Sequence, residues 1–176
     1  MKPFNTLLLI VILITSFAIS VSAQDAPEHR KSPVVIEHTT VGDTYMKVVY
    51  GQPYKRNRAI FGDLVPFNEV WRAGANEATE ITLTGDINFN GETLKAGNYS
   101  LLAIPNQDNW TIVVSSQLGK WGAYSYDENM DVLRTDVPVT SLDEPSEAFT
   151  IQFAEDGSAL SMMWDRTLVS IPIEVK

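Results

Sequence analysis

The chain has 176 residues, a formal net charge of −9 and no cysteine. Without cysteine it cannot form a disulfide scaffold, a thiolate metal site or a cysteine nucleophile. The acidic balance opposes binding to nucleic acid and to anionic membranes, because both carry negative charge.

The N-terminus predicts a signal peptide over residues 1–23. Lys2 precedes an almost unbroken apolar run from residue 7 to residue 21, and the small residues Ser22 and Ala23 follow. This pattern predicts cleavage after Ala23. A membrane anchor is the alternative, but the apolar run is shorter than the roughly 18–20 residues that span a bilayer. We therefore expect a secreted or periplasmic protein without stable membrane insertion after cleavage, and the missing disulfides favour a bacterial source.

About 150 residues remain after cleavage, enough for one domain with its own core. Residues 24–32 are polar and charged, which predicts a flexible leader, and residues 33–176 form the domain. Short runs rich in β-branched and aromatic residues recur along it, with a strong hairpin signal at Asn90-Gly91. The predicted strands are 34–39, 44–50, 79–84, 86–89, 92–95, 98–104, 110–115, 131–139, 148–154, 159–164 and 167–173.

These about ten short strands and the lack of an amphipathic helix predict an all-β fold, a single antiparallel β-sandwich or flattened barrel. The apolar positions expected to form its core are Val48, Tyr50, Ile81, Leu83, Leu101, Ala103, Ile112, Val114, Ile151, Phe153, Met162 and Trp164.

Two long stretches, 51–78 and 116–130, interrupt the strands. Glycines and prolines in the first stretch prevent a long regular element, whereas its many large apolar residues argue against disorder. We expect both stretches to be long ordered loops, and loops of this length are often functional.

The first loop carries a group of residues suited to bind an anionic or polar ligand. Arginine offers forked donors, asparagine and glutamate offer acceptors, and tryptophan offers an apolar face. Alternatively, these side chains satisfy the backbone groups of the loop itself. The group consists of Lys55, Arg56, Arg58, Trp71, Arg72, Asn76 and Glu77.

The second loop carries spaced aromatic rings and carboxylates, which are typical of sugar-binding surfaces. The alternative is a packed corner in which the rings belong to the core and tyrosine hydroxyls bind the backbone. This group consists of Trp121, Gly122, Tyr124, Tyr126, Asp127, Asp131 and Arg134.

No standard catalytic motif occurs in the sequence. The two histidines, His29 and His38, lie in the leader and at a strand edge, with no partner at ligand spacing. Carboxylate sites suit calcium, but no calcium-binding loop motif is present. We therefore predict that no metal or organic cofactor is built into the protein.

Three segments together resemble the bacterial domain of unknown function family 2911. They are FGDLVPFNEVWRAGANEATEI (61–81), LKAGNYSLLAIP (94–105) and WGAYSYDENMDVLR (121–134). The resemblance extends from Ser32-Pro33 to Trp164, nearly the whole mature chain. It implies a secreted β-rich domain, and it implies no activity and no functional residues.

Two functions remain open. The favoured hypothesis is a non-catalytic binding or envelope-interaction module for a polar extracellular ligand such as a glycan. The rival is a hydrolase of glycan or ester substrates that uses Glu77 with Asp127 or Asp131, which requires two carboxyls within about 5–10 Å and one raised pKa. The candidate ligand-binding residues are Arg58, Trp71, Arg72, Asn76, Glu77, Trp121, Tyr124, Tyr126, Asp127 and Arg134.

Overall fold

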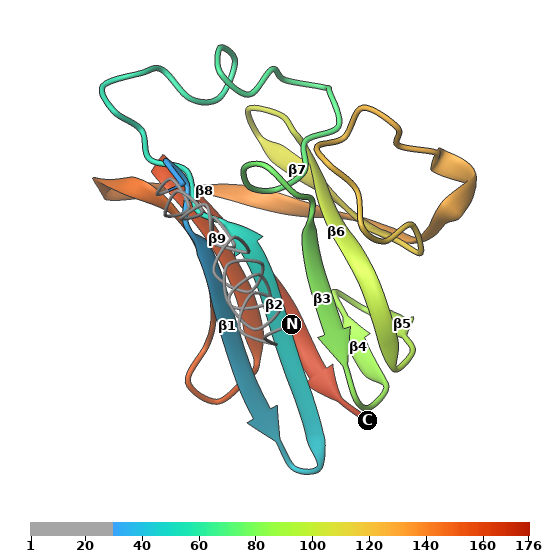
Figure 1. Ribbon diagram of the computed structural model, residues 1–176. Helices are drawn as coiled ribbons and strands as arrows, with labels where there is room; N and C mark the ends of the chain where they lie inside the picture. Colours follow the sequence, from blue (N-terminus) through green and yellow to red (C-terminus); the bar gives the residue numbers. More distant parts are fainter. Residues whose placement is uncertain (1–29) are drawn as a thin grey trace, which may run out of the picture.

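The computed structural model describes residues 30–176 (Figure 1). The predicted signal peptide, its cleavage site and residues 24–29 of the predicted leader lie outside the described residues. Within residues 30–176, no helix has the length and apolar character needed to cross a membrane.

Nine strands form one antiparallel sheet in the order β1-β2-β3-β6-β7-β8-β9-β4-β5. The predicted all-β class is confirmed, and the sheet is not closed into a barrel because β1 and β5 remain at its two ends. The strands are β1 (Val34–Val41), β2 (Thr44–Gly51), β3 (Thr79–Leu83), β4 (Ile87–Phe89), β5 (Glu92–Leu94), β6 (Gly97–Pro105), β7 (Asn109–Ser115), β8 (Asp131–Phe153) and β9 (Ala159–Val175). A three-residue 3-10 helix, η1 (Glu128–Met130), precedes β8.

The sheet is folded into two layers, and the long strand β8 runs from one layer into the other. Its first part pairs with β7 and its second part pairs with β9. The pairing with β9 shifts register between Ser141 and Ser146 and again before Thr150. Such irregularities bend a strand, and β1 contacts β8 although the two are not neighbours in the sheet. The folded sheet therefore encloses the core between its own two halves.

The strand count and lengths differ from the sequence prediction. The predicted strands 131–139 and 148–154 belong to one strand of 23 residues, and 159–164 and 167–173 belong to one of 17 residues. The residues between the first two are mostly polar and include Pro145. In the structure this stretch remains extended. The register shifts interrupt its regular ladder of hydrogen bonds with β9, and proline is tolerated at such irregular positions.

The core forms where the alternation of the strands predicts it. In β2, buried residues from Thr44 to Tyr50 alternate with half-buried ones, and all twelve predicted core residues are buried. The hairpin at Asn90-Gly91 is also confirmed, because both residues have the positive φ of a type I′ turn, 52° and 91°. The first long loop contributes Ile60, Val65 and Trp71 to the same core, so it is ordered as predicted.

Candidate functional site

The first long loop crosses one end of the folded sheet (Figure 1) and is attached to two strands. Trp71 and Ala103 of β6 exchange both backbone hydrogen bonds, at 2.7 and 2.9 Å. The backbone N–H of Ala75 donates to the carbonyl of Gly51 in β2 at 3.0 Å. These bonds hold the segment around residue 72 in a defined position.

A cluster of aromatic rings lies beneath this loop. Trp71 stacks on Trp164 with centroids 6.1 Å apart and planes at 18°, and Phe61 packs edge-on against Trp110 at 4.8 Å. The Trp71 indole N–H donates to the carbonyl of Gly74 at 3.1 Å. Since Trp71 is only 9% exposed, its ring is chiefly a core group, and its bond to Gly74 agrees with the alternative that these side chains satisfy the loop backbone.

A cavity of about 350 Å³ lies above the rings. We call it the basic cavity, because four cationic side chains and no carboxylate line it, in a chain of net charge −9. Its walls also include the aromatic residues Tyr54, Trp71 and Trp164. The cationic residues are Lys31, Arg56, Arg58 and Arg72.

A tight turn presents two of these cations. The backbone N–H of Arg58 donates to the carbonyl of Lys55 at 3.1 Å, and Arg56 and Asn57 between them have φ of 50° and 58°. These angles define a type I′ turn. The Arg58 guanidinium donates to the carbonyls of Lys55 and Tyr54 at 2.9 and 2.6 Å, whereas the Lys55 ammonium pairs with Asp165 at 2.5 Å. Lys55 is therefore not part of the cavity wall.

Arg72 differs from its cationic neighbours. Its Nε is buried and has no hydrogen-bond partner among the described residues. A buried donor left without an acceptor destabilises a protein by about 1–3 kcal/mol, and such groups call for an explanation. Because Nε is closed to solvent, only the terminal Nη groups of this guanidinium could contact a ligand in the basic cavity.

Backbone strain also gathers around this cavity. Seven described non-glycine residues have a left-handed φ, and five of them line the cavity or directly adjoin lining residues. Strained φ angles cluster at binding and active sites, because the surrounding structure must hold them in place. The five are Arg56, Asn57, Ala73, Asn76 and Asp165.

The second long loop joins the first beside this cavity. Glu77 and Trp121 form an isolated β-bridge, and the backbone N–H of Gly122 donates to the carbonyl of Asn76 at 2.9 Å. A second cavity of about 500 Å³ lies between the loops. We call it the apolar cavity, and its walls are Leu64, Val65, Pro66, Glu69, Val70, Trp71, Arg72, Ala123, Tyr124 and Tyr126.

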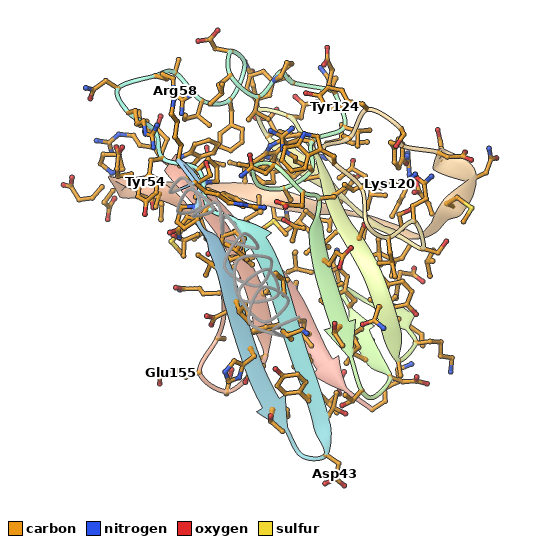
Figure 2. The ribbon with its side chains drawn as sticks, viewed as in Figure 1. Asp43, Tyr54, Arg58, Lys120, Tyr124 and Glu155 are labelled. Carbon is orange, nitrogen blue, oxygen red and sulfur yellow. The ribbon has the colours of Figure 1, made fainter. Side chains whose placement is uncertain are left out.

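The aromatic residues of the second loop divide into two kinds. Tyr124 is 87% exposed and Trp121 is 60% exposed, and Figure 2 shows Tyr124 at the same end of the molecule as Arg58. Tyr126 instead belongs to a side-chain network, in which its hydroxyl donates to Asp131 at 2.5 Å and accepts from Arg134. Burial, followed by the hydrogen bond to Asp131, raises the pKa of Tyr126.

The carboxylates proposed for hydrolysis have other partners. Glu77 accepts two hydrogen bonds from Arg30, both of 2.8 Å, and this pairing lowers the pKa of Glu77. An acid catalyst needs a raised pKa. Asp127 caps the 3-10 helix by accepting from the backbone N–H of Asn129, and Asp131 accepts from Arg134 at 2.6 Å. These contacts support structural roles.

The predicted site residues are thus only partly brought together. Arg58, Trp71, Arg72 and Asn76 line the basic cavity, and Tyr124 and Tyr126 line the apolar cavity. Glu77, Trp121, Asp127 and Arg134 line neither. Sequence reasoning missed Lys31, because it was assigned to the leader; its carbonyl accepts from Arg56 at 2.8 Å.

Residues 30–176 contain no group of three or more histidine, aspartate or glutamate side chains placed to hold a metal ion. The expectation that the protein carries no built-in metal or organic cofactor stays a prediction.

We expect the contact between Arg30 and Glu77 to open in acid. Because the folded protein lowers the pKa of Glu77, the contact is complete above the ordinary glutamate pKa and is lost as the pH falls through the lowered value. An NMR titration of the Arg30 guanidinium should show a midpoint below the ordinary glutamate pKa. Glu77→Gln should abolish this transition, and a midpoint at or above the ordinary pKa would contradict the prediction.

The fold and the site together define a class, an all-β protein with one antiparallel sheet folded over its core and two loops joined beside a basic cavity. Residues 32–173 match the family model described as "Protein of unknown function (DUF2911)", so the chain belongs to this family. The resemblance noted from the sequence is thereby confirmed. Searches of the curated proteins and of the solved structures found no match.

Proposed function

We propose that the protein is an exported, non-catalytic binding module whose basic cavity holds an oxyanion of a polar extracellular ligand, an acidic glycan above all. The observation that carries this proposal is the lining of the basic cavity, which has four cationic residues and no carboxylate in a chain of net charge −9.

The chemistry of the cavity favours an anionic ligand with planar or tetrahedral oxygens. A guanidinium donates through a fork that matches a carboxylate, sulfate or phosphate group. The net charge of −9 repels anions at long range, so binding depends on this local concentration of cations. Uronates and sulfated sugars carry such groups and are met outside the cell.

The walls of the cavity suit a small-molecule site. Such sites have volumes of about 300–1,000 Å³ and combine apolar walls with a few polar groups that fix orientation. The basic cavity holds about 350 Å³ and offers Tyr54, Trp71 and Trp164 beside its cations. The cations and rings of the cavity are held in place before a ligand binds. The turn at Arg56 and Asn57 fixes one side, and the hydrogen bond from Ala75 to Gly51 fixes the other.

A glycan array that contains uronate-bearing, sulfated and neutral sugars tests the proposal. The wild type should bind acidic glycans in preference to neutral ones, and added salt should weaken the binding. Arg72→Met keeps an unbranched apolar stem and removes the charge and the donors of the guanidinium. Because hydrogen bonds to charged groups contribute about 1.5–3 kcal/mol, the variant should bind roughly 10–100-fold more weakly.

Lys47→Met is the matched control, because it removes one positive charge from β2 outside the basic cavity. It should leave binding unchanged, and circular dichroism should show that both variants are folded. Equal binding of neutral and acidic glycans, or unaltered binding by Arg72→Met, would contradict the proposal. Release of shortened glycans by the wild type would instead support the hydrolase hypothesis.

A further inference from the structure

We propose that the basic cavity and the apolar cavity are two subsites of one groove, which binds an acidic oligosaccharide in which an oxyanion-bearing unit is linked to a neutral unit. The inference rests on the proposed function and adds to it a second subsite, a minimum ligand length and a requirement for the second sugar.

The two cavities adjoin one another. Leu64, Val65, Trp71 and Arg72 line both of them. Arg72 therefore stands at the junction, where its guanidinium can contact an oxyanion on one side while the ligand extends to the other. A ligand that filled only the basic cavity would leave the larger cavity, of about 500 Å³, to solvent.

The apolar cavity offers an exposed aromatic ring. Tyr124 is 87% exposed and yet lies close against the chain, because a Cβ atom added to Gly122 would lie 2.7 Å from the ring. The same added atom would lie 3.5 Å from Nη1 of Arg72, so the ring and the guanidinium flank one glycine. A flat ring held in this way can stack on the apolar face of a pyranose.

The charge of the two cavities differs, and this difference defines the second sugar. The basic cavity has four cations and no carboxylate, whereas the apolar cavity has Arg72, shared with the first, and one carboxylate, Glu69. A second oxyanion placed there would be repelled by Glu69 and would meet chiefly apolar walls. The unit bound in the apolar cavity is therefore neutral and presents its ring face to Tyr124.

The test compares free galacturonate and sulfated galactose with disaccharides that link each of them to a neutral sugar, by calorimetry or NMR titration. The wild type should bind the mixed disaccharides about tenfold more tightly than the single acidic sugars. Tyr124→Ala should remove this gain and leave the affinity for the single acidic sugars unchanged. Tyr124→Phe, which keeps the ring, should retain the gain, and the two acidic series distinguish a carboxylate from a sulfate ligand.

Trp121→Ala is the matched control, because Trp121 is an exposed ring of the same loop that lines neither cavity. It should leave the gain intact. If the disaccharides bind no more tightly than the single sugars, or if Tyr124→Ala keeps the gain, the second subsite is refuted while the proposed function stands. If no acidic sugar of either series binds, both proposals fail.

Discussion

Trp164→Ala should lower the free energy of unfolding by about 3–5 kcal/mol, the range for removing a large aromatic ring from a packed core. The ring is 1% exposed, stacks on Trp71 and packs edge-on against Phe61 at 6.2 Å. Its indole N–H also donates to the carbonyl of Glu147 at 3.2 Å, and truncation removes this hydrogen bond although the backbone N–H of Lys55 still donates to the same carbonyl at 2.7 Å. Urea denaturation followed by circular dichroism measures the loss.

Trp121→Ala provides the matched control for this change, because it removes the same side chain from a position that is 60% exposed. We expect its free energy of unfolding to change by no more than about 0.5 kcal/mol, as for most surface substitutions. Similar losses in the two variants would show that the aromatic cluster does not stabilise the fold as described. Since Trp164 also lines the basic cavity, its variant should bind acidic ligands more weakly even where it remains folded.

Gly51→Ala should destabilise the protein by about 3 kcal/mol, near the upper end for overpacking a filled site. A Cβ atom at this position would lie 2.1 Å from the carbonyl oxygen of Ala75. The clash is with backbone, which cannot rotate away as a side chain can, and the hydrogen bond from Ala75 to Gly51 holds the two segments together. The segment that carries Ala75 and Asn76 must move, and with it one wall of the basic cavity.

Gly42→Ala separates this effect from that of glycine replacement in general. Gly42 has no atom near its added Cβ and has a φ of 57°, so only left-handed strain of about 1–2 kcal/mol is expected. It lies beside Asp43, at the end of the molecule opposite Arg58 (Figure 2). Gly42→Ala should therefore retain binding of acidic glycans, whereas Gly51→Ala should weaken it. Full binding by a folded Gly51→Ala variant would contradict the role assigned to this contact.

The proposed export of the protein is independent of these tests. N-terminal sequencing of the exported form should find Gln24 as the first residue, because the signal pattern ends at Ala23. An intact Met1 would contradict it.

The alternation of apolar residues and the turn chemistry were sufficient to predict the all-β class and the core. Residues of β2 and β3 face inward at every second position, a local property of a pleated strand. Asn90-Gly91 encodes its hairpin because both residues tolerate positive φ. The continuity of β8 was not predictable, because residues 140–147 have the composition of a turn and yet remain extended, although only three of them, Thr140, Ser141 and Ser146, pair with β9.

The candidate site was predictable as a region but not as a set of contacts. Loop composition identified Arg58 and Arg72, since arginines stand out in an acidic chain, yet it could not tell which cations pair and which stay free. Lys55 forms an ion pair with Asp165, 110 residues away in the sequence, and Glu77 forms one with Arg30. The Nε of Arg72 has no hydrogen-bond acceptor among the described residues. Strand alternation and turns depend on neighbours in sequence, and so the sequence determined them. The pairing of charges depends on distances between segments that are remote in sequence. Only the tertiary structure, in which the folded sheet brings the two loops together at one end, determined which charges pair.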